Sequence, residues 1–278
     1  MLEWLPLSLP RGRLAESPLW DHRTHTLYWV DILGGALHLF SFETGELKTY
    51  RLDDYVSCVA LTQDVDTVIV TLKNQIAELN TRSGAHRVVA RVEEPGRNRL
   101  NDCKCSPAGE LWFGSMDMYE REPTGSLYVY TGSTLKRVMS GVTISNGIDW
   151  SPDGSLMYYV DSPTRKVGIY KWEGGRLEPS GYIDLSRMPG VPDGLTVDAE
   201  GSVWVAMYGG SSVVKITGAD IQRLPLPYPY VTSCAFGGPR LDTLFITTGS
   251  GDGGAGADGG LLAVKTGARG RAANICNF

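Results

Sequence analysis

The segment ISNGIDWSPDG, at residues 144–154, contains two turn signals, and the second begins four residues after Gly147. Asn-Gly and Ser-Pro-Asp-Gly both favour tight turns, so only one short strand fits between them. We expect that strand at residues 147–150, with Asn146 at its very start. The position of Asn146 therefore raises the question of what a polar side chain does where a strand begins.

The same order of elements recurs along the chain. In LNDCKCSPAGELWFG (100–114) and PDGLTVDAEGSVWVA (192–206), a polar residue opens a short strand, a turn ending in Gly follows, and an aromatic and β-branched strand comes next. Weaker copies complete a set whose opening polar residues are Glu16, Ser57, Asn101, Asn146, Asp193 and Ser233. By subtraction they are 41, 44, 45, 47 and 40 residues apart.

A period of about 40 to 45 residues with four strands per unit is typical of β-propeller blades. Gly and Pro recur at turn spacing, and the segments between them are too short for average helices. The sequence therefore predicts an all-β fold, a six-bladed β-propeller with four antiparallel strands per blade, as a single domain over residues 1–278.

Composition limits the partners and the location of the protein. The 278 residues are 42% hydrophobic and 21% charged, with a formal net charge of −5 and no long run of Lys or Arg, so we expect no nucleic-acid partner. No apolar run reaches the roughly 18 to 20 residues of a membrane span, and no basic segment leads into an apolar stretch near the N-terminus. We expect a cytoplasmic protein without membrane attachment, monomeric or weakly dimeric.

Five cysteines stand at positions 58, 103, 105, 234 and 276. Because the number is odd and no secretory feature accompanies it, we expect reduced thiols. Cys103 and Cys105 would share one face of a strand, but no CxxC motif or nearby His supports a metal site, so we expect a structural role for them.

The innermost strand of each propeller blade borders the central channel, so residues at equivalent positions form a ring at one mouth. Glu16, Asn101, Asn146 and Asp193 would converge there, and two carboxylates in a confined space repel each other unless something cationic lies between them. Carboxylate and amide oxygens suit hard divalent cations such as Ca²⁺, Mg²⁺ or Mn²⁺. Water or substrate oxygens would complete the shell.

Several segments, in order, resemble the SMP-30/gluconolactonase/regucalcin-like family. They are AESPLW (15–20), NRLNDCKCSPAGELWFGSM (98–116), ISNGIDWSPDG (144–154), PDGLTVDAEGSVWVA (192–206) and TSCAFGG (232–238), and the resemblance runs from about residue 10 to about residue 265. It implies a six-bladed propeller with one divalent metal ion that hydrolyses sugar lactones to aldonic acids. The metal, among calcium, zinc, manganese, magnesium and iron(II), is left open.

Residue by residue, Glu16, Asn146 and Asp193 match the family's metal ligands, and Asp193 also matches its proposed general base. Arg99 and Asn101 match positions that contact the substrate's hydroxyls and ring. The expected substrates are aldonolactones such as gluconolactone or xylonolactone.

One departure concerns a substrate-contacting Glu that follows a GTM-like motif by three positions in the family's animal members. Here GSM is followed by Asp117, Met118 and Tyr119, and Glu120 is one place late. Glu120 is the predicted counterpart if the loop shifts by one residue, with Tyr119 or Asp117 as the alternatives.

The expected mechanism follows from metal chemistry. The cation polarises the lactone, water attacks the acyl carbon, and Asp193 either accepts the proton or orients the water, because a carboxylate bound to a cation is a weaker base. Two alternatives stay open. One is a promiscuous esterase or phosphotriesterase on the same metal site, and the other is a non-catalytic calcium-binding propeller.

Overall fold

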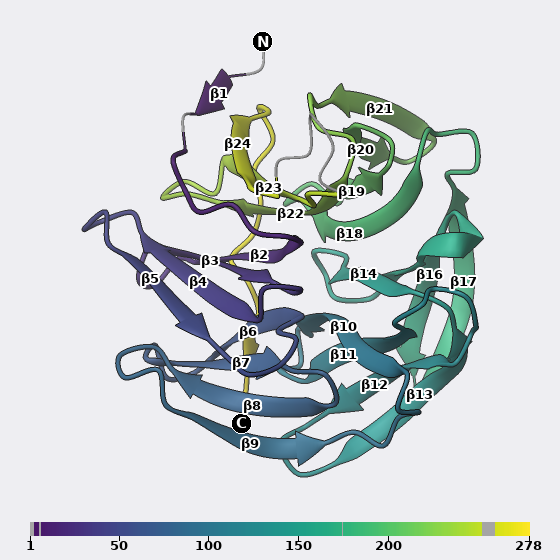
Figure 1. The fold of residues 1–278 in the computed structure, drawn as a ribbon. Helices are drawn as coiled ribbons and strands as arrows, with labels where there is room; N and C mark the ends of the chain where they lie inside the picture. Colours follow the sequence, from purple (N-terminus) through teal and green to yellow (C-terminus); the bar gives the residue numbers. More distant parts are fainter. Residues whose placement is uncertain (1–2, 6, 174, 252–258) are drawn as a thin grey trace.

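The computed structural model describes residues 3–5, 7–173, 175–251 and 259–278. Six antiparallel sheets are arranged around a central axis, as Figure 1 shows, and the prediction of an all-β six-bladed propeller is confirmed. Within the described residues the single helical element is a short 3-10 turn, η1 (Ser162–Thr164). None of the helical structure in this part of the chain is long and apolar enough to cross a membrane.

The strands follow the chain from blade to blade, each blade running from the axis outward. Blade 1 comprises β2 (Ala15–Asp21), β3 (Thr26–Asp31), β4 (Ala36–Ser41) and β5 (Leu47–Arg51). Blade 2 comprises β6 (Cys58–Thr62), β7 (Thr67–Thr71), β8 (Gln75–Asn80) and β9 (His86–Arg91). Blade 3 comprises β10 (Asn98–Cys105), β11 (Leu111–Asp117), β12 (Gly125–Tyr130) and β13 (Leu135–Val142).

The second half of the molecule repeats this plan. Blade 4 comprises β14 (Ser145–Trp150), β15 (Met157–Asp161), β16 (Lys166–Glu173) and β17 (Arg176–Asp184). Blade 5 comprises β18 (Val191–Val197), β19 (Val203–Tyr208), β20 (Ser212–Thr217) and β21 (Asp220–Pro225). Blade 6 comprises β22 (Val231–Gly237), β23 (Thr243–Thr248), β24 (Leu261–Lys265) and, as its outermost strand, the N-terminal β1 (Glu3–Leu5).

The two ends of the chain close the ring. Strand β1 pairs antiparallel with β24, so blade 6 combines the beginning and the end of the sequence. Beyond β24 the C-terminal segment, yellow in Figure 1, runs from blade 6 to blade 2, where β25 (Ile275–Cys276) pairs in parallel with β6. The N-terminal strand thus closes the rim, and the C-terminal segment links blades across the middle of the molecule.

The expectation of reduced thiols is wrong. Cys58 is disulfide-bonded to Cys103 with their Cα atoms 5.8 Å apart, and Cys105 to Cys276 at 5.5 Å, whereas Cys234 is a buried free thiol. The first pair is separated by 45 residues, which is one blade period, so the fold places both cysteines on neighbouring innermost strands within bridging distance. The number of cysteines is odd because Cys234 is unpaired. The blade period was the sequence signal for the Cys58–Cys103 disulfide.

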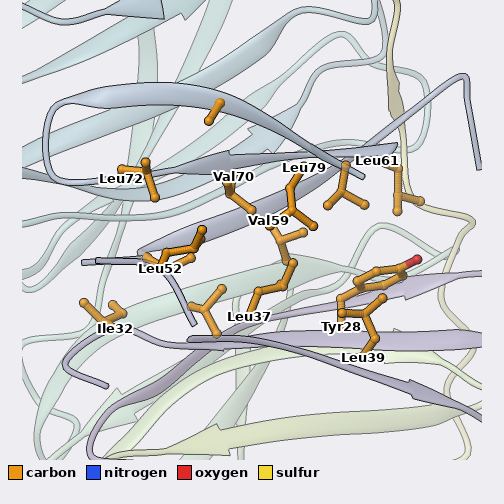
Figure 2. Packing of buried hydrophobic residues seen from close by; sticks show 14 residues of the cluster. Tyr28, Ile32, Leu37, Leu39, Leu52, Val59, Leu61, Val70, Leu72 and Leu79 are labelled. Atoms are coloured by element: carbon orange, nitrogen blue, oxygen red, sulfur yellow. The ribbon is translucent and has the colours of Figure 1, made fainter. Parts of the chain in front are cut away.

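Hydrophobic side chains fill the spaces between blades. Figure 2 shows one such cluster, in which Tyr28, Leu37 and Leu39 of blade 1 face residues of blade 2 such as Val59 and Leu79. Each of these side chains is less than 10% exposed. Packing of this kind leaves the blades as rigid wedges, so the residues at their inner edges are held in fixed positions around the channel.

Candidate active site

Local bulges in the innermost strands place the predicted site residues. In β10, β14 and β18 two residues lie opposite one residue of the neighbouring strand, and these pairs are Asn101-Asp102, Asn146-Gly147 and Asp193-Gly194. In β2 the same irregularity follows Glu16 directly. A bulge re-aims a side chain out of the regular alternation of a strand. The Asn-Gly pair thus forms a bulge inside β14, and the expected turn with Asn146 at the start of the strand is corrected.

All six predicted site residues line one cavity at the end of the channel where the innermost strands begin, here called the site mouth. They are Glu16, Arg99, Asn101, Glu120, Asn146 and Asp193. Apolar residues, among them Leu14, Met116 and Val191, complete the wall. Residues more than 170 positions apart in the sequence are therefore gathered by the blade repeat at one place.

Two glycines allow the blades to approach each other at this mouth. A Cβ on Gly147 would lie 2.7 Å from a side-chain carbon of Leu195 and 2.8 Å from the carbonyl oxygen of Asp193. A Cβ on Gly194 would lie 2.0 Å from the hydroxyl oxygen of Ser233. Any larger residue would push neighbouring blades apart next to the predicted ligands, which gives these glycines a packing role.

A chain of hydrogen bonds joins the polar residues of blades 3 and 4. The Arg99 guanidinium donates to Asn101 Oδ1 at 2.5 Å, and Asn101 Nδ2 donates to Asn146 Oδ1 at 2.6 Å. Asn146 Nδ2 in turn donates to the hydroxyl of Ser162 at 2.8 Å. The amide groups are fixed in orientation, with the Asn146 carbonyl oxygen on the side of Asn101.

Two of the three carboxylates at the site mouth, Glu16 and Asp193, are buried without full compensation. Burial raises the pKa of Glu16 well above its usual range, and the charges of Asp102 and Asp193 add to the increase. Burial likewise raises the pKa of Asp193, with further increases from Asp102 and Glu120. Arg99 is the nearby cation that opposes both shifts. The site mouth therefore has an excess of negative charge, which a bound cation would relieve.

The donor set fits a hard divalent cation. Glu16 and Asp193 supply two carboxylates, Asn146 supplies a carboxamide oxygen, and ligands of this type bind Ca²⁺, Mg²⁺ or Mn²⁺. Among the described residues no three His, Cys, Asp or Glu side chains are grouped so that they could hold a metal ion. A cation at this mouth would therefore have few protein ligands, and water or substrate oxygens would take the remaining positions.

The structure separates the three candidates for the displaced glutamate. Glu120 lines the cavity, whereas Tyr119 is 65% exposed and lies outside its wall. Asp117 is fully buried and forms an ion pair with Arg97. Of the three candidates, Glu120 is therefore the one that lies in the cavity wall.

Two residues next to the site were not singled out from the sequence. Ser162, at the start of η1, binds Asn146 through its hydroxyl and lines the cavity. Asp102 lies beside Asn101 in the β10 bulge, and burial raises its pKa to about 6. The sequence signal for Asp102 was its position next to Asn101. In a regular strand, however, the side chain of Asp102 would point away from the channel, because neighbouring side chains alternate between the two faces.

The opposite end of the channel, here called the tail mouth, has a second cavity. Its wall includes Asp102, Lys104 and Asp149 from the innermost strands and residues 271–274 from the C-terminal segment. Asp149 accepts hydrogen bonds from Lys104 at 3.1 Å and from the backbone N–H of Val197 at 2.9 Å, and it pairs with Arg271 at 3.6 Å. Lys104 and Arg271 thus share Asp149 as their charged partner at this mouth.

Comparison with known proteins shows which family this chain resembles. The family model for the SMP-30/gluconolactonase/LRE-like region matches residues 14–250. A putative sugar lactone lactonase, YvrE, from Bacillus subtilis is 36% identical over 86% of this chain and 84% of its own length. The pentonolactonase XacC from Haloferax volcanii is 32% identical over 87% of this chain and 83% of its own.

A solved structure resembles the whole molecule. It is the crystal structure of a calcium-binding protein, regucalcin, from Agrobacterium tumefaciens, with a TM-score of 0.89 and 26% identity, covering 97% of this chain and 95% of that one. Because the family model covers most of the chain and the relatives match along nearly all of it, the chain belongs to the SMP-30/gluconolactonase/LRE-like family.

Proposed function

We propose that this protein is a divalent-metal-dependent hydrolase that opens sugar lactones to aldonic acids. The observation that carries the proposal is the convergence of Glu16, Asn146 and Asp193 with three polar residues that suit a polyol, Arg99, Asn101 and Glu120, in one cavity. The names of the bacterial and archaeal relatives, a sugar lactone lactonase and a pentonolactonase, support the reaction class.

Glu16, Asn146 and Asp193 would hold the cation. When bound there, it would polarise the lactone and stabilise the negative charge that develops on oxygen during the attack of water. The solved regucalcin with the same fold is described as a calcium-binding protein, which supports a metal ion as cofactor. The ligand side chains are buried and part of the wall is apolar, which strengthens electrostatic interactions with them.

The remaining steps belong to the side chains. Arg99 is buried and can offer its guanidinium donors to substrate hydroxyls, and Glu120 can accept hydrogen bonds from them. Asp193 orients the attacking water or takes its proton as the water adds to the acyl carbon. When the acyl–oxygen bond of the ring then breaks, a proton from Asp193 or from water goes to the ring oxygen. The product is the aldonate, whose new hydroxyl was the ring oxygen.

A pH-indicator assay tests the proposal with glucono-1,5-lactone and xylonolactone, after subtraction of the spontaneous rate. It compares chelator-treated protein, the same protein supplied with single divalent ions, and the Asp193→Ala variant. We expect turnover that disappears with the metal, returns with it and is absent in the variant. Metal binding with no turnover above the spontaneous rate would instead support a calcium-binding propeller, and turnover of phosphotriesters or aryl esters alone would support the promiscuous esterase.

A further inference from the structure

The loop that presents Glu120 has an unusual backbone. Strand β11 ends at Asp117, β12 begins at Gly125, and Glu120 lies between them with a φ of 57°. Left-handed backbone is uncommon for a residue that carries a side chain. Glu120 does not favour this conformation by itself, so other residues must hold the turn that brings its carboxylate to the cavity.

Asp117 holds this turn from inside. Its side chain is fully buried and accepts hydrogen bonds from the backbone N–H groups of Tyr119, Arg121 and Glu122, each at 3.2 Å. The backbone N–H of Glu120 donates to the Asp117 carbonyl oxygen at 2.9 Å. One carboxylate thus fixes the backbone on both sides of Glu120.

Arg97 ties the same carboxylate to the strand that carries the proposed substrate contacts. Its Nε and Nη2 donate to the two oxygens of Asp117 at 3.0 and 2.5 Å. The Arg97 carbonyl oxygen also accepts the N–H of Met118 at 3.0 Å. Because Arg97 precedes β10 by one residue, the loop is attached next to Arg99 and Asn101.

We propose that Asp117 and Arg97 are positioning residues for Glu120 and that, through it, they determine the recognition of substrate hydroxyls. This inference rests on the proposed function. Glu120 and the buried Arg99 line the same cavity and are close enough for their charges to interact, so the cavity offers both an acceptor and a donor. A polyol ring would engage both, and loss of the Asp117 contacts would remove the acceptor while leaving the metal ligands in place.

The test compares Asp117→Asn, Glu120→Gln and the double variant on two substrates. Glucono-1,5-lactone has ring hydroxyls, and δ-valerolactone has none. We expect each single change to lower kcat/KM for gluconolactone by about 10- to 100-fold, mainly through KM, since one charge-assisted hydrogen bond is lost. The rate on δ-valerolactone should change less than about twofold, and the double variant should be no worse than either single one.

Asp21 provides the matched control. Its side chain is also fully buried and accepts hydrogen bonds from Nε and Nη2 of Arg23 at 2.9 and 2.7 Å and from the backbone N–H of Arg23. Unlike Asp117, it has no link to a residue of the cavity wall within the described part of the chain. Asp21→Asn should weaken folding without changing the preference between the two lactones. Equal losses on both lactones for Asp117→Asn, or multiplied losses in the double variant, would overturn the proposal.

A crystal structure of Asp117→Asn gives a second readout that does not depend on turnover. We expect the Glu120 backbone to leave the left-handed region and its carboxylate to leave the cavity wall. An unchanged Glu120 would contradict the positioning role even if activity fell. If the wild-type protein opened neither lactone, the proposed function would fail, and the variant structure would still decide whether Asp117 places Glu120.

Discussion

The two mouths of the channel contain the same kinds of residue in opposite electrostatic states. At the site mouth the carboxylates of Glu16 and Asp193 are buried with little compensation, and their pKa values are raised by burial and by neighbouring carboxylates, above all Asp102. At the tail mouth, Asp149 is just as buried but is bound by Lys104 and Arg271. Burial alone therefore does not mark a functional carboxylate. What distinguishes Glu16 and Asp193 from Asp149 is the lack of enough compensating charge, a feature that is frequent at functional sites.

The same strands supply both mouths. In β10, Asn101 lies at the site mouth and Lys104 at the tail mouth, and in β14 the corresponding residues are Asn146 and Asp149. Residues only three positions apart in one strand thus differ in role, with a proposed binding role at the site mouth and a structural role at the tail mouth. Substitutions at the two mouths should accordingly affect different properties of the protein.

The largest effect is expected at the site mouth. Glu16→Gln removes a proposed ligand charge and should lower the rate of lactone hydrolysis at fixed metal concentration about 10²-fold or more. The chelated variant should be at least as stable as the chelated wild type, because a repelled buried carboxylate has been neutralised. Initial rates and urea unfolding measure both properties. A fully active Glu16→Gln protein would contradict the role of this carboxylate.

Asp149→Ala should show the reverse behaviour. Lys104 and Arg271 would lose their buried partner, and breaking a buried pair costs about 3 to 5 kcal/mol of unfolding free energy. The rate per folded molecule should stay within about twofold of the wild type. Asp153→Ala, at an exposed turn carboxylate, is the control for urea denaturation. Loss of activity in folded Asp149→Ala would show that the two mouths do not have separate roles in stability and activity.

Removal of the Cys105–Cys276 bridge should act on the tail mouth alone. Cys276→Ser frees the end of the C-terminal segment and should lower stability by about 2 to 4 kcal/mol. Hydrogen exchange should become faster for β25 while lactone turnover of folded protein is retained. Cys234→Ala, at the free buried thiol, serves as the comparison variant. Unchanged hydrogen exchange in β25 of Cys276→Ser would show that the disulfide does not hold the C-terminal segment in place.

The smallest effect concerns pH, through Asp102 between the two mouths. Burial raises its pKa to about 6, whereas an unfolded Asp titrates near 4. Between these values the folded protein binds more protons than the unfolded chain, so the stability of metal-free protein should fall as pH rises through this window, by about 2 kcal/mol. Urea midpoints across the window measure it. Asp102→Asn should flatten the profile, and an equally steep profile in that variant would assign the effect to other groups.

The blade repeat was predictable because its period, turn residues and aromatic strands are all local patterns. The gathering of Glu16, Asn146 and Asp193 followed from the register of that repeat. The bulges were not predicted, because Asn-Gly and Asp-Gly signal turns in a sequence and only the ladder shows that they lie inside strands. The pairing of the Asp149 charge with Lys104 and Arg271 was not predictable either, because both partners are distant from Asp149 in the sequence.

The disulfides and the placement of Glu120 show the same limit. Cys105 meets Cys276 through a segment that crosses the molecule, a path that no local pattern specifies. Glu120 reaches the cavity because the buried Asp117 holds a left-handed turn, whereas counting positions after GSM left three candidates open.

The position of a bound metal ion in the active protein would show directly whether Glu16, Asn146 and Asp193 hold it. Crystals soaked with Mn²⁺ would be measured near the manganese absorption edge, together with lactone turnover by the same protein with the same ion. We predict one strong anomalous peak among the oxygens of Glu16, Asn146 and Asp193, and metal-dependent hydrolysis of a sugar lactone. A manganese-dependent enzyme with its peak elsewhere, or with no peak at the site mouth, would contradict the central claim.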